Sequence, residues 1–108
     1  MEKAYRIKKN QEIDALVKQR NSAANGFFVV YAAVNKIDHF RFAVSVSKKY
    51  GNAVERNKMK RRIREITRQA NITAKTDFLI VAKPTARKLD FKEIKDNLTP
   101  LFVKAKIT

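Results

Sequence analysis

The spacing of apolar residues predicts a short helix near the start of the chain. Ile13, Leu16 and Val17 share one face of a helix that would follow Asn10 as its N-cap. The apolar pattern ends near Arg20. The residues that follow, QRNSAANG, are small or polar and are predicted to form a loop.

Two strands are predicted next. Residues 27–34, FFVVYAAV, are rich in β-branched and aromatic side chains and are apolar on both faces. A strand in a sheet that faces water on one side normally alternates apolar with polar residues, so the second face should be covered or used for binding. Residues 40–47, FRFAVSVS, do alternate, with phenylalanine and valine inward. Their outward face consists of Arg41, Ala43, Ser45 and Ser47.

A long helix is predicted from Ala53 to about Ala70. Asn52 is followed three residues later by Glu55, a variant of the capping box that begins helices. The helix should pack against the sheet through a narrow apolar stripe, which consists of Met59, Ile63, Ile66 and Ala70.

The rest of the chain predicts a strand and a final helix. Residues 77–83, DFLIVAK, form the strand, which Pro84 helps to end. The helix begins at Asp90, and its apolar stripe consists of Ile94, Leu98, Leu101, Phe102 and Ala105. Pro100 lies inside this helix and removes one of its hydrogen bonds. Two outcomes are open: a kink at Pro100, or a second short helix capped by Thr99.

Length and composition limit the class of protein. A chain of 108 residues with 44% apolar content predicts one domain over residues 1–108. The absence of cysteine excludes disulfides and thiolate metal sites, and it fits a reducing compartment. No apolar run is as long as a signal peptide or a membrane span, so a cytoplasmic location is expected.

The charge of the chain points to a polyanionic partner. There are 25 lysine and arginine residues against 10 acidic residues, which gives a formal net charge of +15. A net charge of about 2 to 8 is sufficient for the solubility of a small domain. The excess predicts a polyanion, and nucleic acid is the commonest one. Residues 56–64 alone contain six cations and no acid.

These cations gather on one side of the long helix. A helical projection at about 100° per residue places six residues in one arc beside the apolar stripe: Arg56, Asn57, Lys60, Arg61, Arg64 and Arg68. Glu55 and Glu65 are predicted to lie outside this arc. An ordinary solvated helix face mixes both signs of charge and gains from ion pairs one turn apart. We therefore favour nucleic-acid binding over a merely solvated face.

The unexplained face of the first strand is a second candidate binding surface. Phe27, Val29 and Tyr31 could stack on the bases of a single strand. Alternatively, a helix covers this face, and for Phe27 and Val29 this alternative has at least equal weight. Tyr31 is the stronger candidate because its hydroxyl group needs a polar partner.

No catalytic set of residues can be assembled from the sequence. The single histidine, His39, lies beside Asp38 in an expected turn, and the carboxylates are scattered. There is no Ser/His/Asp set, no metal-ligand cluster and no glycine-rich phosphate loop. If the protein takes part in a reaction, the reactive groups are expected to belong to its partner.

Several segments resemble one known family. SVSKKYGNAVERNKMKRRIRE, residues 45–65, resembles the signature of the protein subunit of bacterial ribonuclease P, with its Arg-Asn-x-x-Lys-Arg-x-x-Arg core. AYRIKKNQEI near the start, SAANGFFVVY at 22–31 and DFLIVAKPTA at 77–86 are similar to other segments of that family. The resemblance covers nearly the whole chain.

The resemblance implies a function in tRNA maturation. The holoenzyme of this family removes the 5′ leader from precursor tRNA by hydrolysing a phosphodiester bond. Its RNA subunit is the catalyst and holds the Mg²⁺ ions, so the protein would have no catalytic residue and no metal of its own. The implied partners are that catalytic RNA, in a 1:1 complex, and precursor tRNA. The protein would stabilise their complex and lower the Mg²⁺ requirement.

The resemblance also assigns residues. The family's signature helix lies against RNA, and the expected RNA-binding residues here are Lys48, Lys49, Arg56, Asn57, Lys60, Arg61, Arg64 and Arg68. The family binds the leader between its first helix and the open sheet face, which implies Ile13, Val17, Val29 and Tyr31. The two helix positions are often phenylalanine in relatives and are aliphatic here, so apolar contact is expected from them.

The implied fold is α+β. It is an α/β sandwich with a central sheet of roughly four strands and three helices, which resembles a ribosomal-protein domain. Its β-α-β crossover through the signature helix would be left-handed, whereas about 98% of such connections are right-handed. The pattern of this sequence alone would predict the right-handed form.

Other classes of protein compete with this interpretation. A structural RNA-binding protein of the ribosome has the same kind of composition. A helix-turn-helix DNA-binding protein fits less well, because the basic helix lies between strands and lacks a short turn to a partner helix. A free-standing protein nuclease fits least, because no catalytic set is present.

Overall fold

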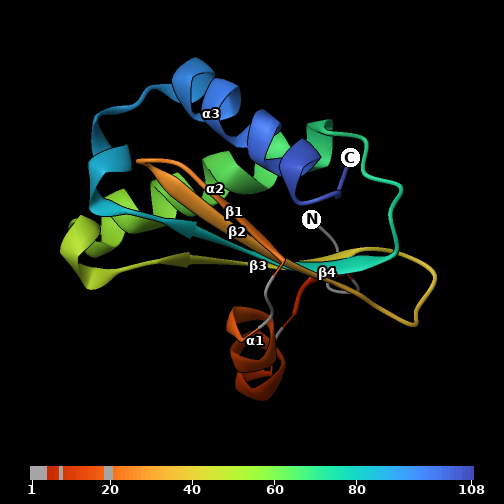
Figure 1. Ribbon diagram of the computed structural model, residues 1–108. Helices are drawn as coiled ribbons and strands as arrows, with labels where there is room; N and C mark the ends of the chain where they lie inside the picture. The colour runs from red at the N-terminus through yellow and green to blue at the C-terminus, as the bar shows by residue number, and fades with distance from the viewer. Residues whose placement is uncertain (1–4, 8, 19–20) are drawn as a thin grey trace.

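The computed structural model describes residues 5–7, 9–18 and 21–108. In these residues the chain forms three α-helices, one four-stranded sheet and two short 3₁₀ helices (Figure 1). Their order is α1 (Asn10–Val17), β1 (Ser22–Ala24), β2 (Phe28–Val34), β3 (Arg41–Val46), η2 (Lys48–Tyr50), α2 (Ala53–Gln69), β4 (Thr76–Ala82), η3 (Pro84–Lys88) and α3 (Phe91–Lys104). None of the helices described is both long and apolar enough to cross a membrane.

The strands are arranged in the order β1-β2-β4-β3. β2 is antiparallel to β1 and β4, whereas β3 and β4 are parallel because α2 connects them. The predicted α+β class, with three helices and four strands, is confirmed. The handedness of the crossover through α2 stays a prediction. Beyond β3, the amide of Ile7 donates to the carbonyl of Phe42 at 3.0 Å, which adds the N-terminal segment to this edge of the sheet.

The sheet is covered on both faces, by different helices. α2 and α3 pack on one face and form the main core with it, whereas α1 lies against the other face (Figure 1). The main core includes the fully buried side chains of Phe28, Phe78, Phe102, Met59, Ile63 and Ile80. The smaller cluster under α1 has Ile7, Leu16 and Leu79 at its centre. α1 thus covers part of the second face of β2, where Val29, Tyr31 and Ala33 are half-buried, and this explains why the strand is apolar on both sides.

The first helix differs from its prediction. Lys9 occupies the N-cap position without a side-chain capping bond, so Asn10 is the first helical residue and not the cap. Leu16 is buried, but Val17 is 47% exposed, because a helix of two turns touches the sheet along one line only. Arg20, where the apolar pattern was expected to end, lies outside the described residues.

The predicted loop before β2 contains a strand. Ser22, Ala23 and Ala24 pair with Tyr31, Val30 and Val29 as the strand β1. Only Ala23 is buried, so this pairing depends on main-chain hydrogen bonds and leaves little trace in the apolar pattern.

The predictions for the two long helices are largely confirmed. At the start of α2 the side chain of Asn52 accepts a hydrogen bond from the amide of Glu55 at 2.9 Å. The Glu55 carboxylate in turn accepts one from the Asn52 amide. Asp90 and Glu93 form the equivalent capping box of α3. The helix α3 continues through Pro100, so a second helix capped by Thr99 is wrong.

Candidate nucleic-acid interface

The basic face of α2 lies beside its buried apolar stripe and consists of Arg56, Asn57, Lys60, Arg61, Arg64 and Arg68. Met59, Ile63 and Ile66 are each at most 1% exposed, and their burial fixes the rotation of the helix. The six side chains lie beside this stripe, as the helical projection predicted: Arg56, Lys60 and Arg64 are half-buried, and Asn57, Arg61 and Arg68 are exposed.

Three adjoining depressions form a shallow groove along this face, which we call the arginine groove. The first, of about 440 Å³, is lined by Val54, Asn57, Arg61 and Arg64. The second, of about 230 Å³, is lined by Arg6, Arg61, Arg64, Glu65 and Arg68. The third, of about 150 Å³, is lined by Arg6, Ile7, Ile13, Phe42, Ala43, Val44 and Arg64. The first and second depressions share Arg61 and Arg64, and the second and third share Arg6 and Arg64, so together they extend from α2 to Ile13 of α1.

The charge in the groove is concentrated at Arg64, which lines all three depressions. Burial lowers the pKa of Arg64, and the positive charge of Arg6 lowers this pKa further. A guanidinium group remains a cation at neutral pH because its pKa stays far above neutrality even when burial lowers it. The groove therefore presents crowded positive charge, with planar donor groups that match phosphate oxygens.

Glu65 contradicts the prediction that acids lie outside the basic face. Its carboxylate is ion-paired with Arg68, whose Nε donates to Oε2 at 3.1 Å, and Gln69 Nε2 donates to Oε1 at 3.1 Å. Residues three apart on a helix are neighbours, which brings this acid beside Arg68. Arg68 is thus partly neutralised. Glu55 does lie apart from the groove, where it caps α2 and pairs with Arg87 at 2.7 Å.

The remaining predicted RNA-binding residues do not line the groove. Arg56 and Lys60 are half-buried on the side of α2 nearer the apolar stripe, and Arg56 Nε is buried without a hydrogen-bond partner among the described residues. Lys48 and Lys49 are exposed on η2, just before α2. The buried ring of Tyr50 anchors η2, and this burial raises the pKa of its hydroxyl group.

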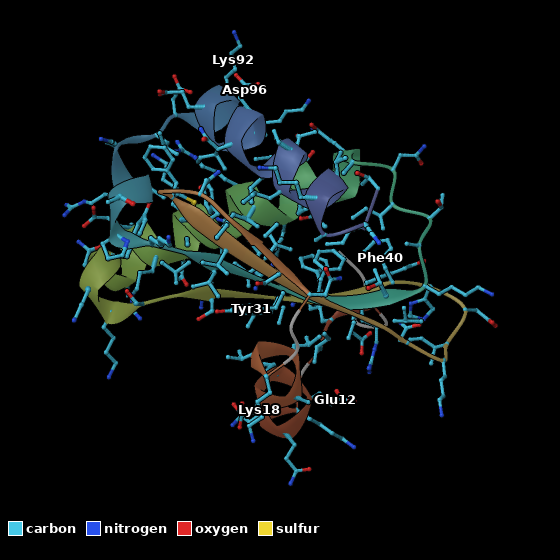
Figure 2. All side chains as sticks on the ribbon, in the orientation of Figure 1. Glu12, Lys18, Tyr31, Phe40, Lys92 and Asp96 are labelled. Carbon is cyan, nitrogen blue, oxygen red and sulfur yellow. The ribbon has the colours of Figure 1, made fainter. Side chains whose placement is uncertain are left out.

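The predicted leader-binding residues are only partly brought together. Ile13 and Tyr31 both pack on the cluster of Leu16 and Leu79. Tyr31 lies between the sheet and α1 (Figure 2). Val29 is half-buried on the same face of β2, opposite Val81 of β4. The exposed Val17 is not part of this cluster.

Phe27 does not belong to this face. Its ring packs against the main core, and Lys88 Nζ lies 5.7 Å from the ring centroid. Of the two alternatives for Phe27, coverage by the protein itself is therefore correct.

Two features of this region were not predicted. Arg6 and Ile7 line the groove although they lie far from α2 in sequence. Arg41 joins α1 to the sheet, with Nη2 2.6 Å from Asp77 Oδ2 and 3.4 Å from Glu12 Oε1. Both features depend on strand pairing between distant segments, and no local pattern of residues signals them.

Comparisons with known proteins agree with this picture. The sequence pattern of the family described as Ribonuclease P matches residues 1–106. The ribonuclease P protein component of Acholeplasma laidlawii is 42% identical over 109 residues, which cover 99% of this chain and 94% of the relative. That of Staphylococcus aureus strain Mu3 is 47% identical over 110 residues, with coverage of 99% and 95%. The solved structure of an S. aureus RNase P protein mutant matches with a TM-score of 0.91 at 45% identity, covering 98% of this chain and 92% of that one.

Proposed function

The chain belongs to the ribonuclease P protein family, and we propose on that basis that it is the RNA-binding subunit that holds the 5′ leader of precursor tRNA and stabilises its complex with the catalytic RNA. As a ribonuclease P protein component, it is part of an endoribonuclease complex, works with an RNA subunit and has a role in tRNA 5′ processing.

The observation that supports this proposal best is the arginine groove. It lies on the helix whose sequence resembles the family's signature, and Asn57, Arg61 and Arg64 line it. Crowded guanidinium groups in an open groove suit the phosphates of a nucleic-acid strand, which can be contacted one after another. We propose that the whole basic face, with Lys48 and Lys49, binds RNA.

The leader is proposed to bind where α1 meets the sheet. Ile13 and Tyr31 offer apolar and aromatic surface there, the half-buried Val29 lies on the same face of β2, and the third depression of the groove is lined by Ile13. Stacking of bases on an aromatic ring tolerates any sequence, as leaders of different tRNAs require. Val17 would contribute through its exposed side chain at the end of α1.

The hydrolytic step is proposed to occur on the RNA subunit, with the Mg²⁺ ions that this RNA holds. The described residues bring no group of three or more His, Cys, Asp or Glu side chains together. The protein would supply fixed cations that offset repulsion between the phosphates of the catalytic RNA and its substrate, and so reduce the Mg²⁺ that the reaction needs. We further propose a 1:1 complex in the cytoplasm.

The experiment that tests this function is cleavage of a 5′-leader precursor tRNA by a bacterial ribonuclease P RNA at low Mg²⁺, with and without the protein. We expect the protein alone to be inert and the RNA to regain accurate cleavage when the protein is added. If the protein binds a matched RNA without changing its cleavage, a purely structural RNA-binding role is the better interpretation.

A further inference from the structure

Arg6 is held at the arginine groove by its own main chain. It forms a parallel bridge with Phe42 at the edge of β3, and the next residue, Ile7, donates its amide to Phe42. The side chain of Ile7 is 5% exposed and belongs to the cluster under α1. Both anchors fix the backbone of Arg6, so its exposed side chain starts from the edge of β3 beside the groove.

Arg6 and Arg64 come from distant segments and line the same two depressions. They repel each other, since the charge of Arg6 is one of the causes that lower the pKa of Arg64. Within residues 5–7, 9–18 and 21–108, neither arginine forms an ion pair. The carboxylate in the second depression, Glu65, is already engaged by Arg68 and Gln69.

Two like charges that separate anchors hold near each other repel, and this repulsion destabilises the fold. An anion bound between them offsets the repulsion. Each guanidinium group offers several N–H donors in a plane, and two such groups on opposite sides can share the oxygens of one phosphate. The two depressions are open at the surface and share Arg6 and Arg64 in their linings, which suits a phosphate that is part of a strand. We propose that Arg6 and Arg64 together clamp one phosphodiester group of bound RNA.

The site would lie at the junction of the two proposed binding surfaces. The second depression continues along α2 to Arg68, and the third reaches Ile13 of α1 and Ala43 of β3. A strand held at Arg6 and Arg64 would therefore have its neighbouring nucleotides directed toward α2 on one side and toward the sheet face under α1 on the other. This inference rests on the proposed function, because it requires that RNA binds at the basic face.

The test measures the affinity of the protein for a matched ribonuclease P RNA as a function of salt. Arg6→Gln and Arg64→Gln are each expected to weaken binding about ten-fold and to lower the salt slope by about one unit. The double variant should lose less than the product of the single losses, because both residues contact the same phosphate. Lys92→Gln removes one charge from α3, on the side of the molecule remote from α1, and is the matched control (Figure 2).

Phosphate ethylation interference identifies the contact directly. Among the RNA phosphates whose ethylation interferes with binding of the wild-type protein, the same single phosphate should lose its interference with Arg6→Gln and with Arg64→Gln. Arg6→Lys keeps the cation and should retain the wild-type salt slope. If Arg6→Gln lowers affinity for inorganic phosphate but not for RNA, the site binds free phosphate and the clamp is wrong.

Failure of the clamp and failure of the proposed function give different results. The clamp is wrong if Arg6→Gln binds RNA with the same affinity and salt slope as Lys92→Gln while Arg64→Gln still weakens binding. It is also wrong if the two arginine variants remove interference at different phosphates. In both cases the wild-type protein still restores cleavage by the RNA. The proposed function itself fails if the wild-type protein leaves that cleavage unchanged.

Discussion

Arg41 on β3 and Asp77 on β4 lie directly opposite each other in the parallel register, and their side chains form a two-point ion pair. Arg41 Nη2 is 2.6 Å from Asp77 Oδ2, and Arg41 Nε donates to Oδ1 at 3.0 Å. The hydrogen bond with Asp77 is the main cause that raises the pKa of Arg41. Arg41 also reaches Glu12, so the pair connects the sheet to α1.

We expect Arg41→Met to lower the free energy of unfolding by about 1 to 2 kcal/mol, because it leaves the half-buried Asp77 carboxylate without its charged partner. Urea denaturation measures the change. Lys36→Met removes one charge from the nearby exposed loop and should stay within about 0.5 kcal/mol of the wild type. Equal stability of the two variants would show that the ion pair contributes nothing.

Glu65→Gln is expected to tighten RNA binding. The substitution releases Arg68 from its ion pair and removes the negative charge from the second depression. The salt slope should become steeper by up to about one unit. Asp96→Asn on α3 removes the same charge away from the groove, and it should have a much smaller effect (Figure 2). If Glu65→Gln and Asp96→Asn tighten RNA binding equally, the affinity depends on net charge and not on the position of Glu65.

Tyr31→Ala is expected to weaken binding of leader-bearing precursor tRNA more than binding of mature tRNA. The tyrosine ring lies on the sheet face under α1, where the leader is proposed to bind. Losing one stacking contact should cost about 1 to 3 kcal/mol for the precursor. Val34→Ala is a control on the same strand, because Val34 is 91% exposed and outside this cluster. Equal losses for both tRNAs would remove Tyr31 from the leader site.

Because Tyr50 is buried, we expect part of the free energy of unfolding to be lost at alkaline pH. Burial raises the pKa of its hydroxyl group in the folded state above the unfolded value of about 10. The neutral form is favoured by folding, so this stabilisation is complete below pH about 10 and is lost as the pH rises through the folded-state pKa. Tyr50→Phe should lack this component in unfolding curves recorded across that range. Parallel pH profiles for variant and wild type would contradict the prediction.

Local patterns were sufficient for the two long helices. The Asn52–Glu55 and Asp90–Glu93 capping boxes each lie within one turn, and the apolar stripe of α2 follows from helical periodicity alone. Predictions for α1 and β1 were weaker. Two turns of helix give a faint period, and β1 depends on a neighbouring strand and not on its own side chains.

The sequence by itself determined the long helices, the main strands, the charge of α2 and the family resemblance, because each depends on residues close together in the chain. Only the tertiary structure decided that Arg6 and Arg64 line the same depressions, that Arg41 joins Asp77 to Glu12, and that α1 packs on the second face of the sheet. These contacts join segments that strand pairing brings together. The free energy that selects them is shared across the whole fold and leaves no local pattern to detect.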